Sequence, residues 1–157
     1  MRLTITVRRY RPGEEDALWS LLHTTVHRVN ATDYSQAQLD AWAPQNCPTE
    51  WCSRLQRTQP LVALAGSELV GFAELEANGH IDCFYTAFNW QNKGVGGVLL
   101  KAIEREAVTL GLPRLYAEVS ITAKDFFLRK GFTFDAERIA EIRGEQLTNY
   151  AMSRRLV

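Results

Sequence analysis

Hydrophobic and polar residues alternate in several short stretches of the chain, and this pattern predicts β-strands. Residues 3–7 alternate in this way, as expected for a strand with one buried face. Three further stretches follow one another in the middle of the chain, at residues 60–66, 68–77 and 79–88. A Gly-Ser pair and an Asn-Gly pair, both typical of tight hairpin turns, lie at their junctions. The middle of the chain is therefore predicted to form three successive antiparallel strands.

Two long stretches carry hydrophobic residues at intervals of three and four, which predicts amphipathic helices. The first follows Pro12, has acidic residues at positions 14–16 that suit its first turn, and carries apolar residues from Leu18 to Val29 on one face. The second follows a group of glycines and is predicted to end at Gly111, before Pro113. Its predicted apolar stripe comprises Val95, Val98, Leu99, Ala102, Ile103, Ala107 and Leu110.

Two short helices are predicted between the first long helix and the strands. Ser35 and Gln38 have the spacing of a capping box, and Pro44 would end the helix that they begin. Thr49 is predicted to cap a second short helix, on which Trp51 lies one turn before a leucine.

The remaining elements define the fold class. Residues 114–120 read as a strand, residues 122–130 as a short helix, and residues 132–156 as a hairpin that turns at Arg143-Gly144. A strand, a long helix and another strand in succession imply a parallel crossover. The chain is therefore predicted to be an α/β (α+β) protein with a mixed, mainly antiparallel sheet of about seven strands and helices on both faces. With no linker or repeat, residues 1–157 are expected to form one domain.

Charge and cysteine content narrow the class of partner. Lys and Arg together number 18, as do Asp and Glu, so the formal net charge is zero and neither nucleic acid nor a membrane surface is an expected partner. Cys47, Cys52 and Cys83 are an odd number without C-x-x-C spacing, which argues against a disulfide framework and a zinc site. With no apolar run of signal-peptide or membrane-span type, a soluble cytoplasmic protein is expected.

A group of glycines at the start of the second long helix points to an anion-binding loop. Glycines let a backbone approach a ligand closely, and a helix N-terminus favours negative charge. A phosphate-binding P-loop is excluded because Lys93 precedes the glycines and no Ser or Thr follows them. A dinucleotide fingerprint is disfavoured because Leu99 stands at the position of its third glycine.

The remaining pattern is Gln91-x-x-Gly94-x-Gly96 between a strand and a long helix. It resembles the Q/R-x-x-G-x-G/A pyrophosphate loop of the GNAT superfamily of CoA-dependent N-acyltransferases. A second segment, Ala123 to Phe132, resembles the A-x-x-F-Y-x-x-x-G-F segment of the same family. The predicted order of elements also matches that fold over nearly the whole chain, so we expect a single GNAT-like domain that binds acetyl-CoA.

The resemblance implies a set of residues that bind the acyl donor. Backbone N–H groups of the loop would hold the pyrophosphate, and backbone groups of the preceding strand would contact the pantetheine and the acyl carbonyl. Ser120 stands where many family members carry Asn, and Phe127 stands at the position of the family's usual tyrosine. The expected donor-binding residues are Phe84, Tyr85, Thr86, Gln91, Asn92, Lys93, Gly94, Val95, Gly96, Gly97, Ser120 and Phe127.

The expected chemistry, attack of an amine on a thioester, needs a base and benefits from an acid. Strand alternation places His80 and Asp82 on one face, so His80 oriented by Asp82 is the predicted base. Glu74 and Glu118 are reserve candidates that more simply read as solvated strand residues. Because Phe127 has no proton to give, the acid is expected to be Tyr85, another tyrosine such as Tyr116, or water, unless the reaction needs no acid.

Alternation along the same strand groups Ile81, Cys83 and Tyr85 on the opposite face. Cys83 would then point away from the reacting groups, which favours direct transfer over a covalent intermediate.

The acceptor pocket is expected in the helical segment that precedes the strands. Tyr34 and Trp42 are predicted to bind the amine by stacking or cation–π contact, whereas Trp51 reads as core packing. His23 and His27 have the i, i+4 spacing of zinc ligands, but no third ligand accompanies them, so no metal is expected.

The predicted function is transfer of an acetyl group from acetyl-CoA to an amine of a small molecule or a peptide, in a ternary complex. The alternatives are an acyl-CoA-binding or sensing module without catalysis, suggested by Phe127, and an interaction domain that uses the fold alone. Exposed strand edges in the C-terminal hairpin make a homodimer a further expectation.

Overall fold

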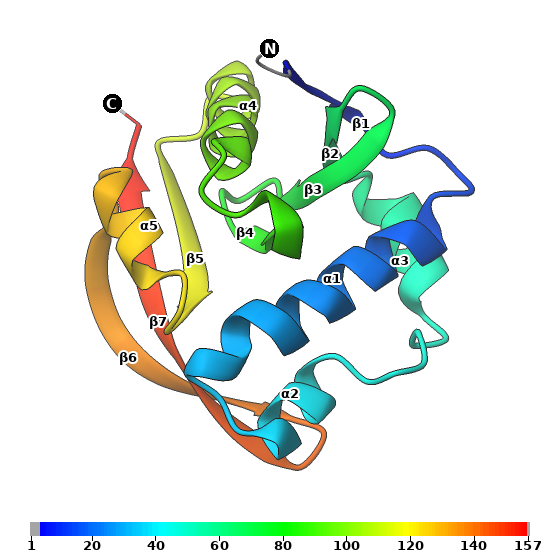
Figure 1. The fold of residues 1–157 in the computed structure, drawn as a ribbon. Coiled ribbons are helices and arrows are strands. Elements are labelled where there is room, and N and C mark those ends of the chain that lie inside the picture. The colour runs from blue at the N-terminus through cyan, green and yellow to red at the C-terminus, as the bar shows by residue number, and fades with distance from the viewer. Residues whose placement is uncertain (1–3, 157) are drawn as a thin grey trace.

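The computed structural model describes residues 4–156, in which seven strands and five α-helices follow the predicted order (Figure 1). The elements are β1 (Ile5–Arg9), α1 (Glu15–Val29), the 3-10 turn η1 (Asn30–Thr32), α2 (Gln36–Trp42), α3 (Trp51–Thr58), β2 (Leu61–Ala65), β3 (Glu68–Leu75), β4 (Ile81–Thr86), the 3-10 turn η2 (Phe88–Trp90), α4 (Val95–Thr109), β5 (Arg114–Ser120), α5 (Lys124–Arg129), β6 (Thr133–Ile142) and β7 (Glu145–Arg155). The predicted fold class, mixed α/β with mainly antiparallel strands, is confirmed.

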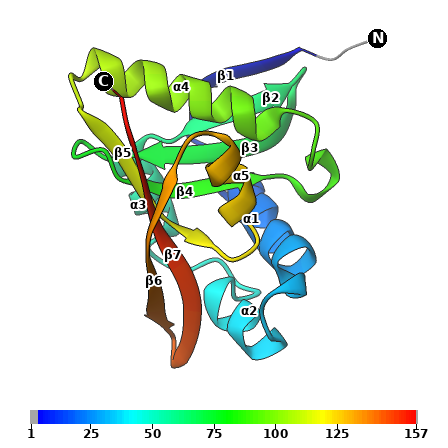
Figure 2. The same cartoon turned by 90° about the vertical axis from the view of Figure 1, so that its left-hand side faces the viewer.

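The strands form two antiparallel groups, in the orders β1-β2-β3-β4 and β5-β7-β6. Among the described residues, the strands of the two groups are joined by one parallel bridge, between His80 and Tyr116. There the N–H of Tyr116 donates to the carbonyl oxygen of Gly79 over 3.0 Å. A Cβ atom at Gly79 would overlap the carbonyl of Arg114, so glycine permits this close approach. Beyond the bridge β4 and β5 diverge, which leaves one edge of β4 unpaired (Figure 2).

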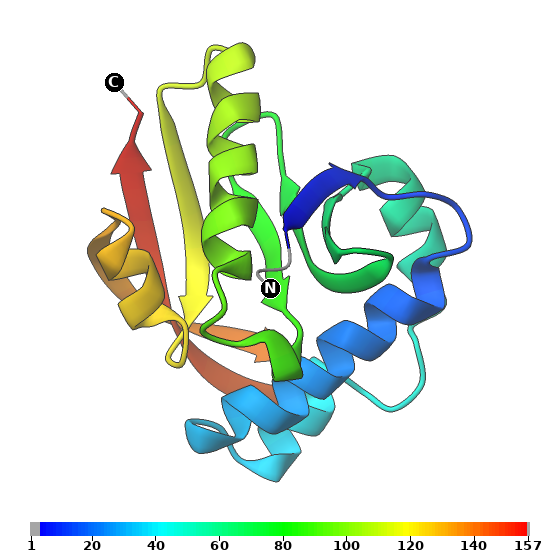
Figure 3. The ribbon, with the colours of Figure 1, turned by 45° about the horizontal axis from the view of Figure 1, so that its top comes forward.

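Helices cover both faces of the strands. Helix α4 lies on one side, over β1 to β4, whereas α1 and α3 lie on the other (Figures 1 and 3). Helix α4 buries Val95, Leu99, Leu100, Ile103 and Ala107. The prediction that Leu110 belongs to this buried stripe is wrong: Leu110 follows the last helical turn and is 55% exposed, and Leu100 is buried instead.

A bulge in β4 changes which residues share a face. Ala73 pairs with Phe84 and Leu75 pairs with Ile81, so β4 advances three residues while β3 advances two. Ile81 therefore packs with Phe84 in the core beneath α4, whereas Cys83 and the ring of Tyr85 pack on the α1 side. The prediction that Ile81, Cys83 and Tyr85 share one face is wrong because it assumed strict alternation.

Local signals at the short helices had mixed outcomes. The capping box of α2 is confirmed, since Ser35 Oγ accepts from the N–H of Gln38 and the Gln38 side chain accepts from the N–H of Ser35. The predicted cap of α3 by Thr49 is wrong, because Glu50 occupies the cap position and makes no side-chain capping bond.

No helix within residues 4–156 is long and apolar enough to cross a membrane.

Candidate active site

A groove of about 650 Å³ opens where β4 and β5 diverge. Its walls come from the end of β4, the glycine loop, the start of α4, β5 and α5. Of the residues predicted to bind the acyl donor, all except Lys93 line this groove: Phe84, Tyr85, Thr86, Gln91, Asn92, Gly94, Val95, Gly96, Gly97, Ser120 and Phe127. These predicted residues are spread over 44 positions of the sequence, and the fold brings them together around one groove.

The glycine loop places the N-terminus of α4 at this groove. Gly94 is the N-cap residue with a φ of 87°, a left-handed conformation that favours glycine. The side chain of Gln91 donates over 2.8 Å to the carbonyl oxygen of Thr86, which ties the loop to the end of β4. The first N–H groups of a helix have no partner within the helix. Those of Val95, Gly96 and Gly97 therefore form a donor set suited to an anion.

Basic side chains from α5 adjoin the loop, and the sequence analysis missed them. Arg129 and Lys130 line the groove. A Cβ atom on Gly97 would lie 3.3 Å from Nζ of Lys130, so this ammonium group is close to the helix N-terminus. Lys93, which was also predicted to bind the donor, lies over the ring of Trp90 and outside the groove lining. The one sequence signal for the α5 pair is its position directly before Gly131.

Phe127 forms part of the floor of the groove. Its side chain is 2% exposed, and its ring centroid lies 5.4 Å from that of Phe84 and 5.1 Å from that of Phe132. Ser120 lies at the end of β5, where its hydroxyl accepts from the N–H of Ala123 at the start of α5. The phenyl ring shapes the groove and supplies no proton.

A second cavity, of about 520 Å³, lies on the α1 side of β4. Both residues predicted to bind the acceptor, Tyr34 and Trp42, line it. Trp51, which was read as core packing, is 3% exposed and lines the cavity as well. The Tyr34 hydroxyl donates to the carbonyl of Thr148 over 2.6 Å, so this ring is held against β7.

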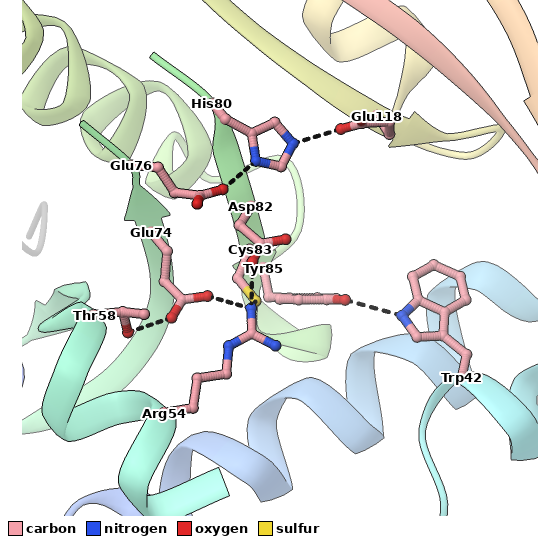
Figure 4. A network of polar contacts seen from close by, with 10 residues as sticks. All are labelled: Trp42, Arg54, Thr58, Glu74, Glu76, His80, Asp82, Cys83, Tyr85 and Glu118. Carbon is pink, nitrogen blue, oxygen red and sulfur yellow. Dashed lines mark hydrogen bonds and ion pairs between the residues drawn. The ribbon is translucent and has the colours of Figure 1, made fainter. Parts of the chain in front are cut away.

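The two cavities meet at a junction, which we define by the five residues that line both: Trp42, Asp82, Tyr85, Glu118 and Ser120. At the junction the indole N–H of Trp42 donates to the Tyr85 hydroxyl over 3.0 Å (Figure 4). Since the Tyr85 oxygen accepts this bond, its own proton is available to another group. Burial raises the pKa of Tyr85, so the hydroxyl stays protonated at neutral pH.

His80 lies at the parallel bridge and is held by two carboxylates. Its Nδ1 contacts Glu76 and its Nε2 contacts Glu118, as Figure 4 shows. Burial lowers the pKa of His80, but the hydrogen bonds to Glu76 and Glu118 raise it more, and the result lies above the ordinary value. The imidazolium form is therefore favoured, and both ring nitrogens are already engaged. Asp82, which was predicted to orient His80, makes no hydrogen bond to it.

Asp82 instead belongs to a network centred on Arg54 of α3 (Figure 4). Nη2 of Arg54 lies 2.6 Å from Glu74 Oε1, 2.8 Å from Asp82 Oδ2 and 3.1 Å from Cys83 Sγ. The bulge accounts for this arrangement, because it turns Asp82 and Cys83 toward the same helix. The reading of Glu74 as a solvated residue is wrong: it is 2% exposed and is also bonded by Thr58.

The network sets the ionisation of its members. Burial raises the pKa of Glu74, yet the hydrogen bonds from Arg54, Cys83 and Thr58 bring it below its usual value. Burial also raises the pKa of Asp82; Arg54 lowers it and Glu74 raises it, and the result lies above the ordinary value. Burial raises the pKa of the Cys83 thiol well above its usual range, so Cys83 is not a thiolate nucleophile.

Comparison with known proteins identifies the fold and the family. A family model described as an acetyltransferase (GNAT) domain matches residues 30–154. The chain belongs to the GNAT acetyltransferase family. An uncharacterized N-acetyltransferase of Escherichia coli K12, YafP, is 31% identical over 148 residues, which are 94% of each chain.

Two solved structures illustrate the likeness of the GNAT domain to its relatives. A GCN5-related N-acetyltransferase from Rhodopseudomonas palustris superposes with a TM-score of 0.93 at 28% identity, covering 99% of this chain and 98% of that one. The PaiA N-acetyltransferase of Thermoplasma acidophilum, determined in complex with coenzyme A, superposes with a TM-score of 0.71 at 18% identity, covering 98% and 99%. The predicted family is confirmed.

Within this GNAT domain the junction lies between the groove that holds the predicted donor residues and the cavity that holds the predicted acceptor residues. Two carboxylates, Asp82 and Glu118, face both spaces. Tyr116, an alternative acid, lines neither cavity and accepts a hydrogen bond from Asn78. Sequence reasoning missed Arg54 because an arginine on the polar side of a short helix gives no sign of a buried partner.

The histidine pair of α1 has a local role. The rings of His23 and His27 stack with centroids 4.2 Å apart, and His27 Nε2 lies 2.8 Å from the carbonyl oxygen of Ala43. Within the described part of the chain, no three His, Cys, Asp or Glu residues are grouped to hold a metal ion.

Proposed function

We propose that this GNAT domain transfers the acetyl group of acetyl-CoA to an amine by direct attack in a ternary complex. The observation that carries the proposal is the junction of two cavities. One is lined by the glycine loop and the other by aromatic rings and carboxylates. Two spaces that share the five lining residues of the junction would let both substrates be bound side by side, so no covalent enzyme intermediate is required.

The donor is proposed to bind along the unpaired edge of β4. Its pyrophosphate would lie on the N–H groups of Val95, Gly96 and Gly97, with Arg129 and Lys130 adding positive charge. The PaiA acetyltransferase, whose fold is similar, was determined in complex with coenzyme A, which supports coenzyme A as the donor's carrier. Backbone N–H groups near Tyr85 would then face the thioester carbonyl, where a donor stabilises the developing oxyanion.

Asp82 is proposed to accept the proton that the acceptor ammonium loses before attack, directly or through water. Its carboxylate faces both cavities, and its raised pKa makes it a better base than an ordinary aspartate. His80, the base predicted from the sequence, is assigned a different role: it holds Glu118 against β4. An imidazolium engaged by two carboxylates has no free lone pair for an amine proton.

The second proton that the amine loses balances the proton that the leaving thiolate gains. As the nitrogen–carbon bond forms, the carbon–sulfur bond breaks and its electron pair goes to sulfur. The Tyr85 hydroxyl is proposed to protonate this thiolate and to regain its proton from the attacking nitrogen through solvent. A thiol with an ordinary pKa near 8.5 is a fair leaving group, so this assistance is modest and Phe127 is tolerated.

The test is measurement of CoA release with acetyl-CoA and a broad panel of amines, beside calorimetric titration with acetyl-CoA. We expect micromolar or tighter donor binding and turnover with at least one amine. Binding without any transfer would contradict the catalytic proposal. It would favour the second candidate, a non-catalytic acyl-CoA-binding module, for which Phe127 in place of the family's tyrosine is the supporting observation.

We infer further that residues 1–157 form one acyltransferase domain. The family model begins at residue 30, but β1 pairs with β2 along its whole length, and α1 packs into the same core as α3. The cytoplasmic location and the homodimer stay predictions.

A further inference from the structure

We propose that the acceptor is a small arylalkylamine, that is, one primary ammonium group carried by a flat aromatic body. This inference rests on the proposed function and specifies its second substrate. It is carried by the charges at the junction, the rings of the second cavity and the contacts that close this cavity.

The junction end of the second cavity attracts a cation. Four carboxylates, those of Glu74, Glu76, Asp82 and Glu118, are arranged there around two basic groups, Arg54 and His80. The local charge is negative even when His80 is protonated. A primary amine with a pKa near 10 arrives as an ammonium ion, so it is drawn to the end of the cavity where the acyl carbon would lie.

The body of the cavity is aromatic. Five rings line it, those of Trp19, Trp51, Tyr34, Trp42 and Tyr85. The rings pack edge to face against one another. The ring centroids of Trp19 and Trp51 lie 5.1 Å apart, and those of Tyr34 and Trp42 lie 5.4 Å apart. Rings fixed in this way present preformed faces and edges to a flat ligand, which gains both apolar burial and aromatic contact.

The cavity is bridged along one side by hydrogen bonds between the α2 region and the C-terminal hairpin. The Tyr34 hydroxyl donates to Thr148, the Gln38 side chain donates to Gln146 over 2.8 Å, and Arg143 donates to the carbonyl of Ala41 over 2.7 Å. An extended peptide crossing this side would have to break these contacts. A volume of about 520 Å³ instead suits a small molecule.

The distribution of charge in the rest of the cavity disfavours a second ammonium group deep inside. Away from the junction the charged lining residues are Glu50, which is exposed, and Arg143, a cation of the β6–β7 turn. A long diamine or polyamine would meet rings and Arg143 rather than a buried carboxylate. A monoamine avoids this cost.

Two lining residues also carry polar atoms without partners. Trp19 is 8% exposed, and neither its indole N–H nor the side-chain oxygen of Asn149 finds a hydrogen-bond partner among the described residues. Unpaired buried polar groups cost stability, which a ligand recovers if it supplies a partner. The aromatic body of the acceptor is therefore expected to carry a hydroxyl, which can accept from the Trp19 N–H group or donate to the Asn149 oxygen, or a ring N–H group, which can donate to the Asn149 oxygen.

The test compares amines of equal charge and different shape with acetyl-CoA as the donor. Tyramine and tryptamine are the probes, hexylamine is the control for a flexible aliphatic body, and spermidine and an alanine tripeptide amide are the competing classes. We expect kcat/KM for tyramine or tryptamine to exceed that of every competitor by at least about tenfold, the effect of one or two aromatic contacts. A preference for spermidine or the peptide would overturn the inference and leave acetyl transfer itself established.

Trp19→Phe sharpens the test, because it keeps a ring but removes the indole N–H group. We expect the KM for tyramine to rise several-fold more than the KM for hexylamine. Phe134→Leu, an exposed aromatic site that lines neither cavity, is the control. An equal change for tyramine and hexylamine would indicate a purely structural role and count against the assignment.

Binding to the CoA-loaded protein, followed by calorimetry, separates the inference from the proposed function. If tyramine binds at least about tenfold more tightly than hexylamine but no amine is acetylated, the cavity assignment stands and the catalytic proposal fails. If no probe binds and none is acetylated, both are overturned.

Discussion

The two cavities of this domain are built in different ways. The donor groove uses the backbone of one continuous stretch, from β4 through the glycine loop to α4, with basic side chains from α5. The acceptor cavity uses side chains from α1, α2, α3, β4, β5 and the C-terminal hairpin. A site made of consecutive backbone groups is visible as a local pattern of glycines. A site made of side chains from six regions exists only after the chain has folded.

The cavities also differ in charge. Arg129 and Lys130 lie at the donor groove, near the positive N-terminus of α4. Asp82 and Glu118 mark the start of the acceptor cavity, with further carboxylates behind them. Under the proposed function, this difference would steer an anionic cofactor and a cationic acceptor to opposite sides of the junction.

The largest expected effect is at the junction itself. Asp82→Asn should lower kcat by about 100- to 1,000-fold, the usual contribution of a positioned base, with little change in acetyl-CoA affinity. His80→Gln should cost less than about tenfold, because His80 is assigned to holding Glu118. Steady-state kinetics of both variants as a function of pH is the measurement. If His80→Gln flattens the rising limb of the profile while Asp82→Asn does not, the base is His80.

A matched pair of glycines tests the donor groove. Gly94 and Gly111 lie at opposite ends of α4, both with positive φ and with nothing within 4 Å of a Cβ atom. Alanine at either position should cost about 1–2 kcal/mol of unfolding free energy for its left-handed conformation. Only Gly94→Ala should also weaken acetyl-CoA binding, by at least about tenfold, because it alters the pyrophosphate cradle. Equal calorimetric affinities in the two variants would argue against the loop assignment.

The Arg54 network tests how the acceptor side sets the basicity of Asp82. Removing the positive charge with Arg54→Met should raise the pKa of Asp82 and move the rising limb of kcat to higher pH. Glu74→Gln removes a negative charge and should move the limb to lower pH. Other charged groups near Asp82, namely Glu76, His80 and Glu118, and the neutral thiol of Cys83 are unchanged in both variants.

Arg54→Lys, which keeps the charge, is the control for this pair. Thermal unfolding should accompany the kinetics, because Arg54→Met leaves Glu74 buried without its ion partner, at a cost of about 3–5 kcal/mol. Shifts of the same sign for Arg54→Met and Glu74→Gln would exclude an electrostatic effect on Asp82.

The smallest expected effect concerns Phe127. Phe127→Tyr places a hydroxyl at the floor of the donor groove, yet the rate of CoA release should change by less than about tenfold, since Tyr85 or water already serves the thiolate. The comparison of parent and variant on one amine at saturating acetyl-CoA measures this. A variant that acetylates amines when the parent does not would show that the parent is a binding module.

The sequence by itself determined the parts of this protein that depend on neighbours along the chain. The hairpin signal at Asn78-Gly79, the capping box at Ser35 and the donor loop from Gln91 to Gly96 all rest on interactions within a few residues. These features consist of particular residue types at fixed spacing. The order of elements therefore followed from the sequence pattern, and the position of the donor groove followed from the resemblance of the glycine loop to the GNAT pyrophosphate loop.

Tertiary structure alone decided the acceptor side. One extra residue in β4 breaks the alternation, so Asp82 meets Arg54 and not His80, and Ile81 joins the core beneath α4. The bulge depends on the pairing of β4 with β3. The burial of Glu74 depends on the packing of α3, which is distant from Glu74 in the sequence. Charge partners and strand register are long-range properties of the chain, and their energies are settled only when separate elements pack together.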